Sequence, residues 1–414
     1  MHFYKKKKEK DIIFNIINKE KLRQENTIQL IASENYASQH VMWGQGSILT
    51  NKYAEGYPKK RYYSGCEVID SVENICKLRA KKVFRCKYVN VQPHSGSQSN
   101  QATYLSLLNI GDSILGLQLD HGGHLTHGFE KNFSGKMYKS FFYNLKKKNS
   151  YINYHMVRKI AIKHNPKLII AGYSAYSKLI NWKIFKSIAR EVGAYLLSDI
   201  SHVSGLIASN VYPSPVKISD IVTSTTHKTL RGPRGGLIIT NCNKIYKKIN
   251  SAVFPGTQGG PLMQNIAAKA ISFKEALSDD FIFYQKRLLR NSKLFSFMMI
   301  NNNFNVISNI TDNHLFLLNV SINGINGKEA EYYLYKCNII VNKNMIPNDK
   351  KHPQMTSGIR IGTPSITTRG FDLKQIKIVS NFINDIIRCH GNNLLLKKIK
   401  MDVIELCKKF PIYE

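Results

Sequence analysis

The sequence predicts an α/β protein with a mostly parallel central sheet flanked by helices, followed by a smaller C-terminal α+β domain. Short apolar segments alternate with helical patterns from about residue 70 to residue 275, as expected when helices connect parallel strands. The chain has 414 residues, enough for two hydrophobic cores. We therefore expect an N-terminal helix and arm over 1–30, a large domain over 31–280 and a small domain over 281–414.

The elements of these domains are predicted from apolar periodicity. Residues 11–30 are typical of an amphipathic helix and a connecting arm, and a long helix is expected over Pro261–Ala276 and its continuation. The strands expected in the large domain are Tyr88–Val91, Ser113–Leu117, Leu168–Ala171, Tyr195–Ser198, Ile221–Ser224 and Gly236–Thr240, with helices over Ser97–Leu108 and Trp182–Val192. The small domain is expected to contain strands near His314–Val320 and Ile339–Val341 and to close with an amphipathic helix from Leu373 to Ile387.

The chain is strongly basic, with 60 Lys and Arg against 27 Asp and Glu and a net charge of +33. Such an excess occurs in proteins that bind nucleic acid or anionic membranes. It also results from mutational drift towards A- and T-rich codons, which favour Lys, Asn and Ile together. The lysines are spread along the chain without an interleaved aromatic motif. We therefore favour drift and expect no specific nucleic-acid partner.

The seven cysteines form no Cys-x-x-Cys pair, so neither a disulfide framework nor a zinc site is indicated. They are typical of reduced thiols. No apolar segment is long enough to cross a membrane, and no cleavable signal peptide is recognisable. The expected location is the cytoplasm, with no membrane and no metal.

One lysine stands between an apolar strand and a glycine-rich turn. Hydroxyl residues that include Thr225, and then His227, precede Lys228, and Arg231–Arg234 follows it. A lysine in such a polar, tightly turned setting can form a Schiff base with an aldehyde cofactor. Because lysine is common in this chain, a solvated surface lysine is the alternative.

Two further segments follow strands of the predicted sheet. Asp199 ends an apolar strand, where open α/β sheets place their ligands; it could pair with a protonated pyridine nitrogen or cap a helix. His202 follows nearby. The segment Ser95–Ser97 joins a strand to a helix, and its free N–H groups and hydroxyls predict an anion cradle that suits a phosphate.

Three more motifs carry polar groups in unusual settings. His124 and His127 lie within the glycine-rich loop Gly122–Gly128; His124 suits stacking on an aromatic ring, and metal binding is the alternative. Glu55, in a segment rich in Tyr and Gly, could transfer a proton or lie in a subunit contact. Arg360 stands between apolar neighbours, where a guanidinium binds a substrate carboxylate or a buried structural acid.

Together these motifs resemble those of the serine hydroxymethyltransferases, pyridoxal-phosphate enzymes of fold type I. The resemblance extends from Ile31–Tyr36 to Thr356–Pro364 and includes the longer blocks Thr50–Pro58 and Phe254–Met263. It implies a homodimer with shared active sites. The implied reaction of one-carbon metabolism transfers the hydroxymethyl carbon of serine to tetrahydrofolate through aldimines of pyridoxal 5'-phosphate, giving glycine and 5,10-methylenetetrahydrofolate.

The resemblance also implies roles for single residues. Catalytic roles fall on Lys228, which holds the cofactor, and on Glu55, His124, Tyr63 and Thr225. Cofactor contacts fall on Asp199, His202, His124, Ser174, Ser95, Gly96, Ser97 and His227, with Tyr53 and Gly260 of the partner subunit at the phosphate. Arg360 and Ser33 bind the substrate carboxylate, Glu55 and Tyr63 of the partner subunit reach the hydroxymethyl group and folate, and Leu119, Gly123, His124, Leu125 and Asn344 line the folate pocket. His227 is also expected to influence reaction specificity.

One segment departs from the family pattern. Bacterial members often carry Ser-Pro-Phe where this chain has His352-Pro-Gln354, so an aromatic packing surface for folate is missing there. Other enzymes of the same fold, such as threonine aldolases and aminotransferases, share the lysine and the aspartate. They lack the combination of the Glu55 segment with the Gly122–Gly128 loop.

Overall fold

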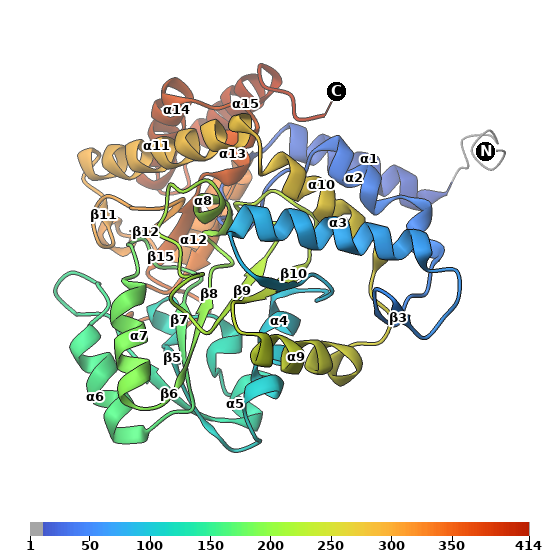
Figure 1. The fold of residues 1–414 in the computed structure, drawn as a ribbon. Coiled ribbons are helices and arrows are strands. Elements are labelled where there is room, and N and C mark those ends of the chain that lie inside the picture. Colours follow the sequence, from blue (N-terminus) through green and yellow to red (C-terminus); the bar gives the residue numbers. More distant parts are fainter. Residues whose placement is uncertain (1–10, 414) are drawn as a thin grey trace.

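A seven-stranded sheet forms the centre of the molecule in a computed structural model that describes residues 11–413 (Figure 1). The strand order is β4-β10-β9-β8-β7-β5-β6. The strands are β4 Tyr88–Asn90, β5 Ser113–Leu117, β6 Lys139–Tyr143, β7 Leu168–Gly172, β8 Tyr195–Asp199, β9 Ile221–Thr225 and β10 Gly236–Thr240. Strands β6, β5, β7, β8 and β9 pair in parallel, and β10 is antiparallel to both β9 and β4. The prediction of a mostly parallel sheet is confirmed.

Helices cover both faces of this sheet. Successive residues of a strand point to opposite faces, and β7 illustrates the result: Ile169 packs in a core with Phe185 and Phe273, whereas Ile170 packs in a separate core with Tyr104 and Ile249. The helices around the sheet are α3 Glu67–Phe84, α4 Gly96–Leu107, α5 Phe133–Met137, α6 Tyr154–His164, α7 Trp182–Glu191, α8 Ser204–Ala208, α9 Asn243–Ser251 and α10 Met263–Glu275. Helices α3, α7 and α10 lie on the first face, and α4 and α9 on the second.

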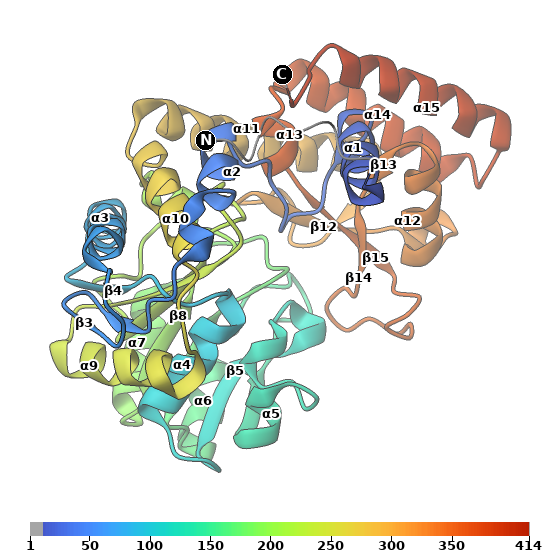
Figure 2. The ribbon, with the colours of Figure 1, turned by 90° about the vertical axis from the view of Figure 1, so that its right-hand side faces the viewer.

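A second, antiparallel sheet has the order β11-β12-β15-β14 and its own core. Figure 2 shows this part, in orange and red, beside the central sheet. Its strands are β11 Asn305–Val306, β12 Leu315–Asn319, β14 Asn342–Asn344 and β15 Gly358–Gly362, and its helices are α11 Asp279–Asn301, α12 Gly327–Lys336, α13 Pro364–Thr368, α14 Leu373–Arg388 and α15 Asn393–Lys408. The strands β1 Ile28–Gln29 and β13 Ile339–Ile340 pair in parallel at its side.

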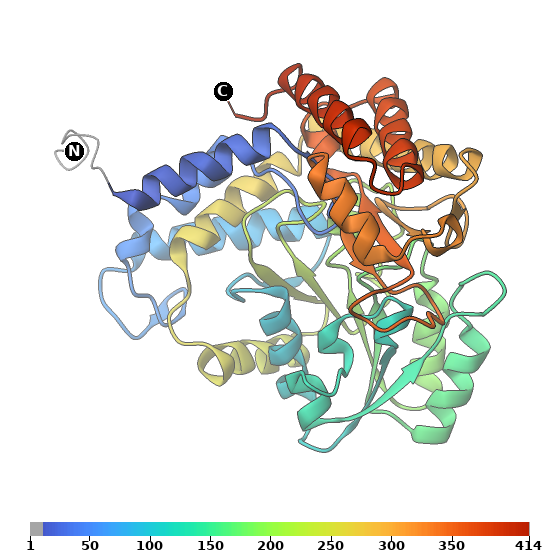
Figure 3. The ribbon, with the colours of Figure 1, turned by 180° about the vertical axis from the view of Figure 1, so that it is seen from behind.

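The chain before the central sheet contributes short elements to both parts (Figure 3). They are α1 Ile12–Glu25, α2 Gln39–Gln45, and the hairpin of β2 Gly56–Tyr57 with β3 Lys60–Arg61. The remaining short helices are η1 Ile48–Asn51, η2 Leu119–His121, η3 Leu125–His127, η4 Ala252–Thr257 and η5 Ser321–Asn323. Ile28 and Leu30, at the end of the predicted N-terminal arm, are buried in the core of the second sheet. The residues of α1 are not buried in the single chain.

The structure corrects three expectations about these elements. The edge strand β6 was not predicted; it begins with the polar residues Lys139 and Ser140, and only Tyr143 is fully buried. The long helix expected from Pro261 is two helices. The first ends at Glu275, and Ser278 caps α11 by accepting a hydrogen bond from the Phe281 N–H at 3.3 Å. The helix from Leu373 does not close the chain, since α15 follows a turn at Gly391, whose φ is 89°.

Within residues 11–413, no helix is long and apolar enough to span a membrane.

Candidate active site

A cavity of 370 Å³ lies at the carboxyl ends of the central strands, where ligands of open α/β sheets bind. Strand β8 supplies Asp199, and the loop after β9 supplies Lys228. Arg360 reaches the cavity from β15 of the second sheet. The predicted residues that line this cavity are Ser33, Ser95, Gly96, Ser97, His124, Ser174, Asp199, His202, Thr225, His227, Lys228 and Arg360.

Lys228 is buried, with 7% of its surface exposed. The turn behind it is closed by backbone hydrogen bonds: the Arg231 N–H donates to the Lys228 carbonyl at 3.1 Å, and the Gly232 N–H donates to the Thr226 carbonyl at 2.7 Å. Burial lowers the pKa of the Lys228 amine to about 8, although the charge of Asp199 opposes this shift. A neutral fraction of the amine is therefore present near neutral pH, and only the neutral amine is nucleophilic.

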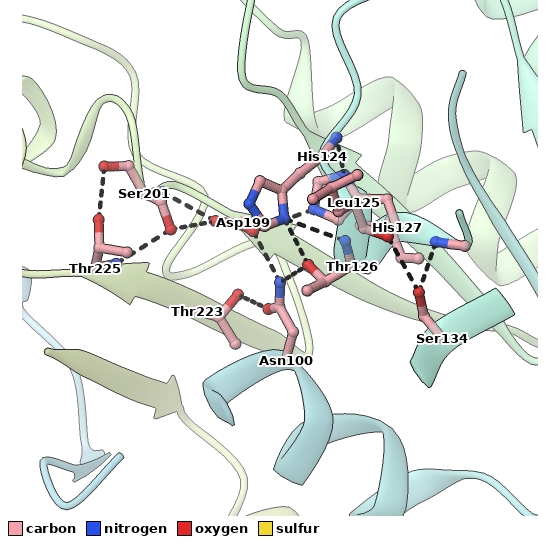
Figure 4. Close-up of polar contacts among 12 residues, drawn as sticks. Asn100, His124, Leu125, Thr126, His127, Ser134, Asp199, Ser201, Thr223 and Thr225 are labelled. Carbon is pink, nitrogen blue, oxygen red and sulfur yellow. Dashed lines mark hydrogen bonds and ion pairs between the residues drawn. The ribbon is translucent and has the colours of Figure 1, made fainter. Parts of the chain in front are cut away.

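Asp199 is the centre of a hydrogen-bond network (Figure 4). One carboxylate oxygen accepts from the Ser201 hydroxyl at 2.6 Å and the Ser201 N–H at 3.1 Å; the other accepts from Asn100 Nδ2 at 3.0 Å and His127 Nε2 at 3.1 Å. Burial by itself would raise the pKa of Asp199, but the hydrogen bonds from His127 and Ser201 hold the pKa well below its ordinary value. Asp199 is therefore an anion throughout the physiological pH range.

The network also fixes the protons of the two loop histidines. The backbone N–H of His124 donates to His127 Nδ1 at 3.4 Å, so His127 carries a ring proton on Nε2, facing Asp199. His124 Nδ1 accepts from the Thr126 N–H at 3.2 Å and is 2.8 Å from the Thr126 hydroxyl. Burial lowers the pKa of His124 to about 4. His124 is thus a neutral, oriented ring at the cavity wall, and the two histidines have separate partners.

The start of α4 provides an anion cradle beside the lysine. The Ser95 hydroxyl caps the helix by accepting from the Gln98 N–H at 3.2 Å, which leaves the N–H groups of Gly96 and Ser97 without an acceptor in the helix. A side chain at position 96 would place its Cβ 2.5 Å from the Thr225 methyl group, so glycine is required for this close approach. The Thr225 hydroxyl itself donates to the Ser201 carbonyl at 3.2 Å.

Two buried side chains at the cavity, His227 and Arg360, have a ring nitrogen without a hydrogen-bond partner and a charge without a counter-ion, respectively, among the described residues. His227 Nδ1 is buried and has no hydrogen-bond partner within the described residues. Arg360 is 9% exposed and donates to the Ser174 carbonyl at 2.9 Å and the Asn342 side-chain carbonyl at 3.2 Å. Among residues 11–413 it forms no ion pair with a carboxylate. A buried structural acid, the alternative for Arg360, is therefore not found there, and its guanidinium remains available to a carboxylate ligand.

A second cavity, of 850 Å³, adjoins the first at His124 and Ser174. Its lining includes all of the residues that the resemblance implies for folate: Leu119, Gly123, His124, Leu125 and Asn344. Pro353, from the segment that departs from the family pattern, also lines it, and Phe129 contributes an aromatic side chain to the wall. An extended ligand in this cavity could therefore reach the first one.

The residues expected to act from a partner subunit lie together elsewhere in this chain. Tyr53 and Tyr63 pack edge to face with ring centroids 5.4 Å apart, and the Tyr53 hydroxyl donates to Glu55 at 3.5 Å. The charge of Glu55 raises the pKa of Tyr63. Gly260 lies against the Tyr53 ring. Among the described residues that line the two cavities, none belongs to this cluster, and both tyrosines are about half exposed, at 57% and 47%.

Several supporting residues were not predicted. Asn100 and Ser201 bind Asp199 directly, and Tyr173 lines the cavity. His314 lies with its Nε2 3.1 Å from His202 Nδ1, and the two rings stack with centroids 5.3 Å apart. A single Asn, Ser or Tyr gives no sequence signal of this kind. His314 stands at the start of a predicted strand far from the other motifs, so nothing in the sequence linked it to His202.

The buried histidines predict that the protein loses stability in mild acid. Burial lowers the pKa of His124 to about 4, and that of His227 and His314 to about 3. Unfolded histidines have a pKa of about 6.5, so between these values the unfolded chain binds more protons than the folded one, and stability falls as the pH falls. We expect the free energy of unfolding of the ligand-free protein to drop by about 1 kcal/mol per buried histidine from about pH 7 to about pH 5.5.

Urea unfolding at the two pH values measures this change. His314→Gln should reduce the drop by about 1 kcal/mol, whereas His155→Gln, at an exposed position of α6, should leave it unchanged. Equal stability of the wild-type protein at both pH values would contradict the assignment of neutral buried histidines.

Comparison with known proteins agrees with the motifs. A family model described as serine hydroxymethyltransferase matches residues 6–383. A protein named serine hydroxymethyltransferase from Phytoplasma mali (strain AT) is 55% identical over 414 residues, covering 99% of this chain and 98% of the relative. Proteins of the same name from Wigglesworthia glossinidia brevipalpis and Legionella pneumophila (strain Lens) are 54% and 52% identical, covering 100% and 97% of this chain and 99% and 97% of their own lengths.

Proposed function

Because the chain belongs to the serine hydroxymethyltransferase family, we propose that its two adjoining cavities carry out the reversible transfer of the serine hydroxymethyl carbon to tetrahydrofolate. The products are glycine and 5,10-methylenetetrahydrofolate. The observation that carries the proposal is the meeting of Lys228, Asp199 and Arg360 in one cavity that adjoins a second, larger one. The first cavity suits an amino acid with its cofactor, and the second suits the folate.

The residues of the first cavity fit pyridoxal 5'-phosphate. The free N–H groups of Gly96 and Ser97, the Ser95 hydroxyl and the unpartnered Nδ1 of His227 suit a phosphate. The permanently anionic Asp199 suits the pyridine nitrogen, and Lys228 suits the aldehyde. His124 would stack on the ring, and Ser174 and His202 would contact its phenolic oxygen. When bound, this cofactor supplies an electron sink for cleavage of the serine Cα–Cβ bond.

The protein side chains orient the substrate and hold its charges. Arg360 binds the serine carboxylate through its planar guanidinium, and Ser33 assists it. The Arg360 side chain is fixed in advance by its hydrogen bonds to Ser174 and Asn342, so little side-chain entropy is lost when serine binds. Thr225 and His227 shape the wall beside Lys228, and His227 influences the choice of reaction from the phosphate side.

Folate occupies the second cavity, against Leu119, Gly123, Leu125 and Asn344. Phe129 provides an aromatic wall within this chain, which supports folate binding although His352-Pro-Gln354 replaces the more usual Ser-Pro-Phe. His124 lines both cavities, so it lies between the amino acid and the carbon carrier.

The active protein is a homodimer of fold type I in which each subunit completes the site of the other. Glu55 and Tyr63 reach the substrate of the partner subunit, and Tyr53 and Gly260 reach its phosphate. Two observations support this assignment: these residues line neither cavity of their own chain, and Arg61 holds the segment that carries Tyr53 and Glu55 in shape. The Arg61 guanidinium donates to the Ala54 and Gly56 carbonyls at 2.9 Å and pairs with Glu73 at 2.8 Å.

The separation of the cores beside the central sheet from the core of the second sheet supports the proposed division into an arm over 1–30, a large domain over 31–280 and a small domain over 281–414. Helix α11 connects the domains, since Leu288 packs in the first core and Phe295 in the second. We place the protein in the cytoplasm, in keeping with its reduced cysteines.

Serine cleavage with and without folate tests the proposed function. Purified protein supplied with pyridoxal phosphate should form glycine from serine when tetrahydrofolate is present, together with 5,10-methylenetetrahydrofolate in equal amount. Without tetrahydrofolate, glycine formation should fall by at least about 100-fold, because the hydroxymethyl carbon then has no acceptor in the second cavity. Equal rates with and without tetrahydrofolate would indicate an aldolase instead.

A further inference from the structure

Helix α10 carries a buried lysine that the reaction does not use. Lys269 is 1% exposed, and its ammonium donates three hydrogen bonds to backbone carbonyls: Val91 at 2.7 Å, Pro93 at 2.9 Å and Gly236 at 2.9 Å. All three N–H donors of the ammonium are thereby used. Its partners are neutral carbonyl groups, whereas most buried lysines are paired with a carboxylate.

This arrangement is costly for a residue that only fills space. Burial lowers the pKa of Lys269 to about 8, although Cys76 and Glu73 oppose the shift, which shows that the ammonium is poorly solvated. An apolar side chain of similar length would avoid that cost. The charged side chain donates three hydrogen bonds to the backbone, which an apolar side chain could not do.

The three carbonyls belong to two chain segments that meet beside the anion cradle. Val91 and Pro93 lie in the connection from β4 to Ser95, which caps α4. Gly236 is the first residue of β10, directly after the turn that carries Lys228. The Gly236 N–H also donates to the Pro93 carbonyl at 3.0 Å. Lys269 therefore joins the backbone before the cradle to the backbone after the lysine loop.

A second side chain of α10 holds the same loop. Asn265, one helical turn before Lys269, donates to the Arg234 carbonyl at 2.7 Å. The fit is close: a Cβ at position 235 would lie 2.4 Å from Lys269 Cε, and a Cβ at position 236 would lie 2.3 Å from the Ser95 carbonyl oxygen. Glycines at 235 and 236 thus allow the loop to lie directly on the lysine and on the start of α4.

We propose that Lys269 is a positioning residue that holds the phosphate cradle in place against the start of β10 before the cofactor binds. The inference rests on the proposed function, because it takes the ligand of the cradle to be the phosphate of pyridoxal 5'-phosphate. Preorganised donors bind a phosphate more tightly because their ordering is not part of the binding free energy. Lys269 acts through the backbone of the cradle and does not contact the ligand.

The test compares two ligands that differ only in the phosphate. The full-length chain, freed of cofactor, is titrated with pyridoxal 5'-phosphate and with pyridoxal, and the dissociation constants are measured from the change in protein fluorescence. Lys269→Met should weaken binding of pyridoxal phosphate by about tenfold or more. Methionine cannot donate the hydrogen bonds that hold the backbone of the cradle, and the loss of one such bond corresponds to about a tenfold change in affinity. Binding of pyridoxal, which does not use the cradle, should change by less than about threefold.

Two variants serve as controls on the same helix. Lys274→Met, at an exposed position of α10, should bind both ligands like the wild type. Lys269→Gln keeps an amide donor and should lose less affinity for pyridoxal phosphate than Lys269→Met. Thermal unfolding of each ligand-free variant shows whether the fold is kept.

The outcomes separate this inference from the proposed function. Equal weakening of both ligands, unchanged affinity in a folded Lys269→Met, or unfolding of Lys269→Gln as well as Lys269→Met would overturn the positioning role. The last result would show that Lys269 serves the whole fold. A wild-type chain that binds pyridoxal phosphate no more tightly than pyridoxal would instead contradict the cofactor assignment itself.

Discussion

Replacement of Lys228 by alanine is expected to lower serine turnover by at least about 10⁴-fold. Lys228 is the lysine that lines the first cavity, and its buried amine has a pKa lowered to about 8. Among residues 11–413, no other lysine lines this cavity, so none is placed to form the Schiff base that holds the cofactor aldehyde. Turnover is measured as glycine formed from serine and tetrahydrofolate, with pyridoxal phosphate in excess so that weaker cofactor binding does not limit the rate.

The fold should survive this substitution. Removing a buried ammonium removes its desolvation cost, and the turn is closed by backbone hydrogen bonds that alanine keeps. We expect a thermal midpoint of the ligand-free variant within about 5 °C of the wild type. Lys217→Ala, at an exposed lysine of the same sheet region, is the matched control and should keep full activity. Wild-type turnover in Lys228→Ala would refute the proposed role of the lysine.

Much of the central sheet could be predicted because its strands are short, apolar and bounded by turn residues. The bounds of β5 and β10 match the expected ones, and β7, β8 and β9 are each longer by one residue. Each of these strands contains at least two consecutive apolar residues and is largely buried. The edge strand β6 is apolar only at its end, Phe141–Tyr143; it begins with Lys139 and Ser140 and is mostly only partly buried. The break between α10 and α11 depends on a single capping serine, which periodicity alone does not reveal.

The candidate site was predictable where a motif combines chemistry with position. Asp199 and Lys228 follow neighbouring parallel strands, so the rule for open α/β sheets brings them to one edge. Arg360 could not be placed beside them from spacing, because it comes from a different sheet; only the resemblance linked it to the site. The supporting contacts, such as Asn100 with Asp199 or Lys269 with the Pro93 carbonyl, join residues about 99 and 176 positions apart. Such contacts follow from the fold and not from any local pattern.

The second large effect is expected for Asp199→Asn, which keeps the size of the side chain and removes its charge. In the wild type, Asn100 and His127 both donate to one carboxylate oxygen, and Ser201 donates to the other. An amide can accept at one end only, so its NH₂ group must face a donor or force His127 to change its protonated nitrogen. More importantly, a neutral amide no longer stabilises a proton on the pyridine nitrogen. We expect serine turnover to fall by about 10³-fold, or about 4 kcal/mol of transition-state stabilisation.

A cofactor with a fixed positive charge distinguishes this electrostatic role from a general loss of structure. If Asp199 acts by keeping the pyridine nitrogen cationic, pyridoxal phosphate methylated on that nitrogen should restore part of the activity of Asp199→Asn, because its charge needs no proton. The same compound should not restore Lys228→Ala, whose defect is the missing amine. Asp220→Asn is the matched control: Asp220 pairs with Lys186 at 2.6 Å away from both cavities, so its loss should lower stability and leave turnover unchanged. Full activity of Asp199→Asn with the natural cofactor would show that the charge of this carboxylate is not required. The four hydrogen bonds that Asp199 accepts would then serve only to hold His127 and Asn100 in place.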